Sequence, residues 1–300
     1  MIAQSQVLQR GPATGRVFFF LAFVAALAVP LHAQSGKPKS KPYIPMQHRL
    51  HSSGAEVHKP NMKVFQKGEA LTYEVSYMGI ALGAITTKVV SVDSSASGTR
   101  IRTEGYIRSY KGVPFVDLKT TYKSAVDRHC SSIAFHSKEL FEDTTYKYID
   151  YNYSKDRDTL IVIERLGKDT LKYKTDTLSL DGKRWQDGLS LLFYARAHAH
   201  QQYRDTVPVL MYKTKAEAII EFGSDKEEVD IDAVDYDIDA VKLEGVSKFT
   251  GIFGLTGDFE GWFSRDKYAV PLTAKMHVII GSVRLELVAW KKPGWNPPKQ

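Results

Sequence analysis

One cysteine, Cys130, occurs among the 300 residues of this sequence. A single thiol forms no internal disulfide, so the fold has to be stable through its apolar core alone. The G-x-S-x-G pattern of a serine nucleophile is also missing, because Gly188–Leu192 lacks the second glycine. A glycine-rich phosphate-binding loop does not occur either. The sequence therefore gives no support to a disulfide-stabilised fold, to a serine hydrolase of that type or to a P-loop protein.

An excess of positive charge on the folded part is absent as well. The chain carries 41 basic and 34 acidic residues, a formal net charge of +7. Residues 1–63 hold eight of the basic residues and one of the acidic ones, which leaves 33 of each in residues 64–300. A nucleic-acid-binding domain carries its basic footprint on the folded part. The composition therefore argues against a nucleic-acid partner.

A hydrophobic run long enough to span a membrane is missing too. The longest run, residues 17–31, has about 15 residues, whereas a membrane-spanning helix needs about 20. It follows Arg10 and Arg16 and ends near the small residue Ala33, which is typical of a secretory signal peptide. We predict cleavage near Ala33, a periplasmic or secreted location, and no transmembrane segment in the mature chain. An uncleaved N-terminal anchor is the alternative.

The chain divides into four parts by composition. Residues 1–33 are the predicted signal peptide. Residues 34–63 are rich in Lys, Pro, Ser and His and lack periodicity, which is typical of a disordered basic linker. Residues 64–292 carry the pattern of a single antiparallel β domain, and residues 293–300 form a proline-rich tail.

Alternation of apolar and polar residues predicts about a dozen β-strands in residues 64–292. The clearest of them is Leu71–Tyr77. A slip in the alternation predicts a bulge between Tyr148 and Ile149. A second slip predicts that the acidic run Asp225–Asp239 contains a bulge or a break into two strands.

The last strands predict a hairpin. Residues 272–280 and 283–289 alternate, and the pair Gly281-Ser282 between them fits a two-residue loop.

Residues Trp185–His198 predict the one helix of the domain. Its apolar face is formed by residues at helical spacing, namely Leu189, Leu192, Phe193, Arg196 and Ala197. Asp187 is placed to accept a backbone N–H of the first turn. A lone amphipathic helix among strands has to cover an apolar sheet face. We therefore predict a mainly β fold: a large curved antiparallel sheet or open β-barrel with one amphipathic helix packed on it.

Patterns for metal binding or catalysis are weak. His198 and His200 diverge by about 200° on a helix, which does not suit a shared metal, and side chains facing water explain them. The acidic run lacks the loop pattern of an EF-hand, with loose calcium binding as the alternative. Cys130 and His129 are adjacent, so on a strand they point to opposite faces. We predict no metal, no cofactor and no catalytic residue.

Aromatic residues leave two interpretations open. The segment 146–153 carries four tyrosines that could stack on sugars or form cross-strand pairs that stabilise a sheet: Tyr146, Tyr148, Tyr151 and Tyr153. Trp185 and Trp262 could line the mouth of a pocket or belong to the core.

Three segments, taken in order, carry a family resemblance. They are Phe65–Tyr77 (FQKGEALTYEVSY) with Gly83 following, Gln186–Arg196 (QDGLSLLFYAR), and Gly261–Leu272 (GWFSRDKYAVPL) before the closing hairpin. The chain resembles the domain of unknown function 3108 family of exported bacterial proteins. The resemblance implies a periplasmic or secreted antiparallel β-protein and supplies no catalytic residues.

These observations favour an exported envelope protein that is not an enzyme. Our first hypothesis is that it binds an apolar or lipid-like ligand in a cavity between sheet and helix. Carbohydrate or cell-wall binding or hydrolysis is the second, and a structural role with an unknown protein partner in an envelope assembly is the third. The candidate ligand-binding residues are Trp185, Asp187, Phe193, Arg196, Trp262 and Asp266.

Overall fold

The computed structural model describes residues 58–300 except 97, 114–116, 143, 168–171, 251–255 and 279–280. The predicted signal peptide and most of the predicted linker lie outside the described residues. Within the described part, none of the helices is both long and apolar enough to cross a membrane.

The described residues form fourteen strands, one α-helix and one short 3₁₀-helix. The helices are η2 (Met62–Val64) and α2 (Ser190–His198). The first eight strands are β1 (Ala70–Tyr77), β2 (Ile80–Ser95), β3 (Gly98–Ser109), β4 (Lys119–Val126), β5 (Ser132–Glu142), β6 (Thr145–Tyr153), β7 (Thr159–Leu166) and β8 (Lys172–Ser179). The remaining six are β9 (Tyr203–Met211), β10 (Thr214–Val229), β11 (Ile238–Ser247), β12 (Gly257–Ser264), β13 (Pro271–His277) and β14 (Ser282–Lys291).

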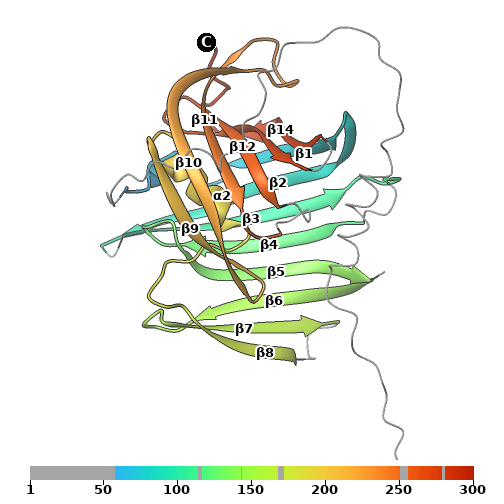
Figure 1. Cartoon of the computed structure of the whole chain (residues 1–300), viewed down its shortest axis with the longest axis vertical. Coiled ribbons are helices and arrows are strands. Elements are labelled where there is room, and N and C mark those ends of the chain that lie inside the picture. The colour runs from blue at the N-terminus through green and yellow to red at the C-terminus, as the bar shows by residue number, and fades with distance from the viewer. Residues whose placement is uncertain are drawn as a thin grey trace, which may run out of the picture.

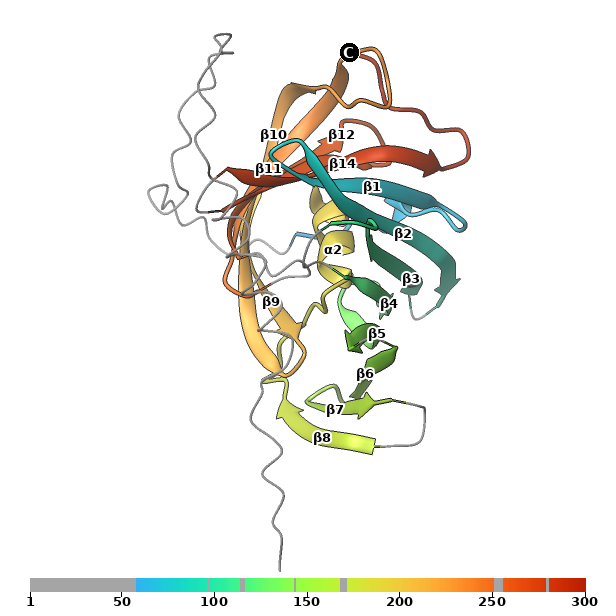
Figure 2. The same cartoon turned by 90° about the vertical axis from the view of Figure 1, so that its right-hand side faces the viewer.

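All fourteen described strands belong to one antiparallel sheet. Its order is β8-β7-β6-β5-β4-β3-β2-β1-β14-β13-β12-β11-β10-β9, so that β8 and β9 are its two edges and the sheet is open. The sheet bends around α2, with β9–β11 on one side of the helix and β2–β6 on the other (Figures 1 and 2). The predicted fold class, a curved antiparallel sheet with one helix packed on it, is confirmed.

The core lies on the concave face of the sheet. In β1 the burial alternates, with Leu71, Tyr73, Val75 and Tyr77 buried, as the sequence pattern predicts. The helix buries Phe193, Arg196, Ala197 and His198 against this face. Of the predicted apolar helix face, Leu192 is only half-buried.

The helix is shorter than predicted, because α2 begins at Ser190 rather than near Trp185. The backbone ahead of it is engaged by strands on both sides of the bend. Ser132 N donates to Trp185 O at 3.0 Å, and Gln186 forms an isolated bridge with Val209 of β9. Backbone groups bonded in this way are not available for the helical i to i−4 pattern.

The two sequence predictions that rest on slips in the strand alternation have different outcomes. The acidic run breaks into two strands, since β10 ends at Val229 and β11 begins at Ile238. The predicted bulge between Tyr148 and Ile149 is wrong, because both residues pair in continuous register with β5 and β7.

The predicted two-residue loop of the last hairpin is also wrong. His277 pairs with Ser282, so Ser282 belongs to β14 and the connection begins earlier, at residue 278.

Candidate functional site

Arg196, on the buried face of α2, joins the helix to three other segments. Both oxygens of the Glu69 carboxylate accept hydrogen bonds from its guanidinium, and Val64 O accepts a third at 3.1 Å. The carbonyl oxygens of Tyr268 and Ala269 accept from Nε at 3.2 and 3.1 Å. Arg196 is 2% exposed. A buried charge bound on every side in this way fixes the position of the helix.

Lys292 completes a buried cluster of three charges with Glu69 and Arg196. Its ammonium donates to Glu69 and lies 4.3 Å from the ring centre of Tyr268. Burial raises the pKa of Glu69, but attraction and hydrogen bonds from Arg196 and Lys292 outweigh that effect, so the pKa is lowered. Burial also lowers the pKa of Lys292, despite its contact with Glu69. Arg196 is therefore the main partner of the carboxylate.

Asp187 caps the other end of the helix, as predicted. Its Oδ1 accepts hydrogen bonds from the backbone N–H groups of Leu189 and Ser190, both at 2.8 Å. Its Oδ2 accepts from the Ser124 hydroxyl of β4 at 2.6 Å. The side chain is fully buried, and burial raises its pKa although these hydrogen bonds oppose the shift.

Trp185 and Phe193 are core residues rather than pocket residues. Trp185 is 4% exposed, and its indole N–H donates to Leu180 O at 2.9 Å. The Phe193 ring packs on Phe65 with ring centres 5.5 Å apart. Both side chains thus have the partners that a structural role requires.

Asp266 holds the turn after β12 together. Its Oδ1 accepts from the Ser264 hydroxyl and from the N–H groups of Tyr268 and Ala269, and its Oδ2 accepts from the Trp295 indole at 2.6 Å. Arg196 binds two carbonyl groups of this same turn. The structure therefore brings two of the six predicted residues, Arg196 and Asp266, to one place.

Trp262 lies apart from the other five predicted residues. Its indole N–H donates to Glu227 at 2.6 Å, and the ammonium groups of Lys242 and Lys275 each lie 5.3 Å from its ring centre. Trp262 also belongs to the cluster of buried core residues, so polar and apolar neighbours both contact its ring.

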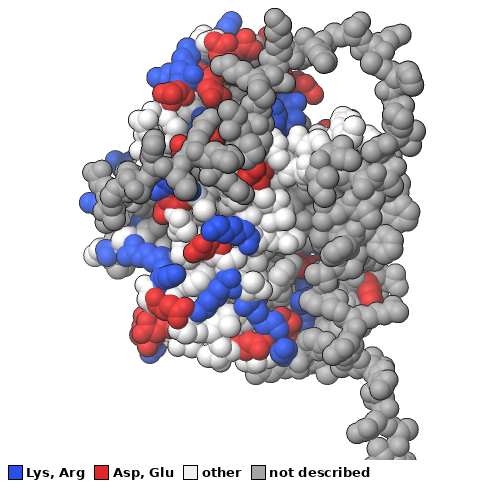
Figure 3. All heavy atoms as spheres, in the orientation of Figure 1, with Lys and Arg blue, Asp and Glu red and all other residues white. Residues whose placement is uncertain are grey.

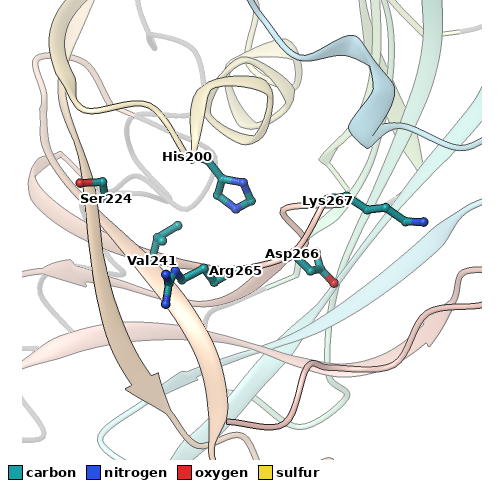
Figure 4. Close-up of a pocket in the computed structure, with 6 residues that line it drawn as sticks. All are labelled: His200, Ser224, Val241, Arg265, Asp266 and Lys267. Atoms are coloured by element: carbon teal, nitrogen blue, oxygen red, sulfur yellow. The ribbon is translucent and has the colours of Figure 1, made fainter.

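A polar pocket of about 390 Å³ opens beside the Asp266 turn, between the end of α2, β10 and β11. It is lined by His200, Ser224, Val241, Arg265, Asp266 and Lys267. The His200 ring points into the space, whereas the Lys267 side chain points away from it (Figure 4). Ligand pockets usually measure about 300–1,000 Å³, and this volume lies near the lower end of that range.

The hydrogen-bonding groups of this pocket include both acceptors and donors. His200 Nε2 donates to Ser264 O at 3.0 Å, which leaves Nδ1 as an acceptor. The Arg265 guanidinium supplies donors, and it lies 3.5 Å from Oδ1 of Asp239, a buried oxygen of a residue that does not line the pocket. The lining residues therefore include cationic and anionic groups, and both donors and acceptors of hydrogen bonds.

Beside Gly188, just ahead of α2, the apolar space between the described strands is small. A pocket lined by Tyr122, Phe135, Glu139, Tyr151, Gly188, Leu210, Met211 and Tyr212 measures about 10 Å³. That volume holds about one water molecule. At this place the concave face is filled by side chains, so an acyl chain does not fit without movement of the strands.

The expectation that His198 and His200 face water is wrong for His198 and confirmed for His200. His198 is 2% exposed, donates to Tyr194 O at 2.8 Å and packs on the Tyr194 ring, so the expectation that it faces water is wrong. Burial lowers its pKa. His200 is exposed and belongs to the polar pocket. Among the described residues, groups of three His, Cys, Asp or Glu side chains placed to hold a metal ion do not occur.

Sequence reasoning missed several residues around the site. Glu69 has a usable signal, because the alternation that buries Leu71 and Tyr73 also places Glu69 on the concave face. A buried acid requires a basic partner, and Arg196 lies on the buried helix face. Lys292 and Trp295 have no comparable signal, since their contacts depend on where the C-terminal segment crosses the sheet.

Comparison with family models matches residues 72–288 to Protein of unknown function (DUF3108). Comparison with curated proteins finds no match.

Three solved structures resemble the fold distantly. A β-barrel-like protein of domain of unknown function DUF1849 from Brucella abortus has 12% identity and a TM-score of 0.45, over 75% of this chain and 97% of that one. A protein described as exported, with a YmcC-like fold, from Bacteroides fragilis has 12% identity and a TM-score of 0.34, over 78% and 98%. A protein described as a lipoprotein from Parabacteroides distasonis has 13% identity and a TM-score of 0.35, over 78% and 97%. These likenesses are too distant to carry an argument about this chain.

Replacing Arg196 by methionine is expected to destabilise the protein by about 3–5 kcal/mol, because Glu69 then keeps a buried charge without its main partner. Urea unfolding at pH 7 measures the loss. Since the pKa of Glu69 is lowered by folding, its contribution is present above pH 4.5 and is lost as the pH falls. The variant should lose part of this pH dependence. Arg102→Met is the control, because Arg102 forms an exposed pair with Asp93. Equal stability of the two variants would contradict the anchoring role.

Replacing Asp187 by alanine is expected to destabilise the protein more than replacing it by asparagine. Asparagine keeps an acceptor for the N–H groups of Leu189 and Ser190, whereas alanine leaves these buried donors unpaired, at about 1–3 kcal/mol each. Thermal unfolding compares the variants. Amide hydrogen exchange at Leu189 and Ser190 should accelerate in Asp187→Ala alone, and unchanged exchange there would show that the carboxylate is not the cap.

Proposed function

Since this chain belongs to the DUF3108 family of proteins of unknown function, we propose its role from its own geometry. The protein is an exported, non-enzymatic binding protein of the bacterial envelope. It holds a hydroxyl-rich ligand, such as a sugar unit, in the polar pocket between the end of α2 and the sheet. The observation that carries this proposal is the mixed set of donors and acceptors around a space of about 390 Å³.

The chemistry of the pocket suits hydroxyl groups, each of which both donates and accepts. His200 Nδ1 offers an acceptor, and the Arg265 guanidinium offers donors. The Asp266 carboxylate is already bonded to the turn and to Trp295. A purely anionic ligand would meet the Asp266 carboxylate, and a purely apolar one would leave the polar lining groups unpaired.

Export is supported by the sequence. Arg10, Arg16, the short apolar run 17–31 and Ala33 form the pattern of a cleaved signal. A stable core without disulfides is compatible with an envelope compartment. The periplasm or the medium is therefore the proposed location.

Titration with single sugars tests the pocket. Glucose, galactose, mannose and N-acetylglucosamine are added to the mature chain, and backbone and His200 ring resonances are followed by NMR. At least one sugar should shift His200, and Arg265→Ala should weaken its affinity at least tenfold. Arg102→Ala is a matched control, since Arg102 is another exposed arginine paired with an aspartate.

Three outcomes would contradict the pocket assignment. They are the absence of any shift at His200, an affinity unchanged by Arg265→Ala, and shifts by palmitate at the Tyr122 and Phe135 pocket in place of sugar shifts at His200. The last result would favour the apolar ligand.

Expression of the full chain in a bacterium tests export. The mature protein is expected outside the cytoplasm, and mass spectrometry should show a chain that begins near Gln34. Deletion of residues 17–31 should retain the protein in the cytoplasm, with a cytoplasmic enzyme as the fractionation marker. An intact N-terminus on membrane-bound protein would favour the uncleaved anchor instead.

A further inference from the structure

The outer side of β3–β7 forms a surface that the pocket does not use, and we call it the convex face. A Cβ at Gly105 would lie 3.0 Å from Leu189 beside α2, and Ser124 contacts Asp187, so these residues point toward the helix. Their neighbours along the strands point outward by alternation. Figure 2 shows α2 on the inner side of these strands, so the convex face lies on the opposite side.

Strand register places outward side chains of the convex face in straight rungs across the sheet. One rung runs Tyr106, Thr121, Lys138, Tyr148 and Arg165, from β3 to β7. The next runs Lys88, Glu104, Lys123, His136 and Asp150, from β2 to β6. A third contains Arg108 with Lys119, and Leu140 with Tyr146. Neighbouring strands lie about 4.8 Å apart, so each rung presents a regular series.

Basic side chains rest on tyrosine rings along these rungs. Lys138 lies 4.4 Å from the ring centre of Tyr146 and 5.7 Å from that of Tyr148, and Lys119 lies 5.9 Å from Tyr146. Such contacts are cation–π interactions, which leave the ammonium groups at the surface rather than neutralised by carboxylates. Lys88 lies 4.9 Å from the Tyr106 ring, at the end of the surface next to β2.

The three rungs carry six permanent cations and two carboxylates. The cations are Lys88, Arg108, Lys119, Lys123, Lys138 and Arg165. Both carboxylates are already paired: Glu104 with Lys123, and Asp150 with Arg165 at 2.6 Å and with His136 at 2.7 Å. The surface is therefore net positive, although residues 64–300 carry equal numbers of basic and acidic residues.

The face of the molecule that has β9 and β10 in front carries mixed charge. Over this face, Lys and Arg side chains lie interspersed with Asp and Glu side chains (Figures 1 and 3). The acidic run Asp225–Asp239 belongs to that half of the sheet, at the end of β10 and the start of β11. The three rungs of the convex face therefore hold an excess of positive charge, which the other residues of 64–300 balance.

We propose that the convex face binds an acidic polysaccharide laid across strands β3–β7. Its carboxylate or phosphate groups meet the lysines, which the tyrosine rings beneath them hold in place. The choice of a polysaccharide rests on the export in the proposed function, since that compartment holds acidic glycans rather than nucleic acid. A membrane is disfavoured because, among the described residues of β3–β7, Ile161 is the only large apolar side chain that is well exposed.

The test uses the mature chain, residues 34–300, with polygalacturonate as the probe and dextran as the neutral polymer. Polygalacturonate should bind, dextran should not, and affinity should fall steeply as salt rises from 50 to 300 mM, since exposed charge contacts are screened. Lys119→Gln/Lys138→Gln should weaken binding at least tenfold. Lys299→Gln is the matched control, because Lys299 also lies over a tyrosine ring, at 5.9 Å from Tyr236.

One further variant and two further probes distinguish the convex face from the pocket and from other kinds of partner. Arg265→Ala should leave polygalacturonate binding unchanged, so that failure of the pocket and failure of the convex face are distinguishable. Tighter binding to an oligothymidine or to phosphatidylserine vesicles than to polygalacturonate would overturn the proposal. So would polymer binding that the double lysine variant leaves intact, or polymer binding that salt does not weaken.

Discussion

The buried pairing of Arg196 with Glu69 is the contact on which the arrangement depends. An open curved sheet leaves an apolar concave face that has to be covered, and a nine-residue helix has few apolar residues with which to cover it. Burying a charge is costly unless every donor is bonded. In this protein the donors of one guanidinium are bonded by η2, by the residue ahead of β1 and by the turn after β12. The helix is therefore held in one position on the sheet, because a shift would separate the buried Arg196 from Glu69.

The sequence predicted correctly those features that depend on residues close together in the chain. Alternation in β1 gave the strand and its buried face, and the spacing of Phe193, Arg196 and Ala197 gave the buried side of the helix. The helix start was missed because Gln186 satisfies its backbone groups on β9, a strand that lies later in the chain. The bonds of Trp295 to Asp266 and of Lys292 to Glu69 were missed for a similar reason, since they depend on where the last segment crosses the sheet.

The way the interior is filled decides where a ligand can sit. The Trp185 indole donates to Leu180 O, and the Phe193 ring packs on Phe65. Across the bend, the Tyr151 hydroxyl donates to Tyr212 O. Trp185 and Phe193, which the sequence analysis selected for an apolar cavity, are buried in the core instead. Space remains at the polar rim, where the helix ends at His198 and the turn after β12 approaches β10 and β11. A hydroxyl-rich ligand follows from this geometry more directly than an acyl chain does.

The net charge of residues 64–300 does not show how the charged side chains are distributed over the surface. Thirty-three basic and thirty-three acidic residues cancel along residues 64–300, and the cancellation gave a sound argument against a domain that is basic as a whole. Strand register, however, decides which residues share a surface. Because the side-chain period of a strand is two, Lys119, Lys123 and Lys138 fall on one face, while the acidic run lies beyond the bend at β10 and β11. A neutral domain of this kind presents a positive face without any excess of charge. The proposal of an acidic polysaccharide on the convex face therefore rests on the register rather than on the net charge.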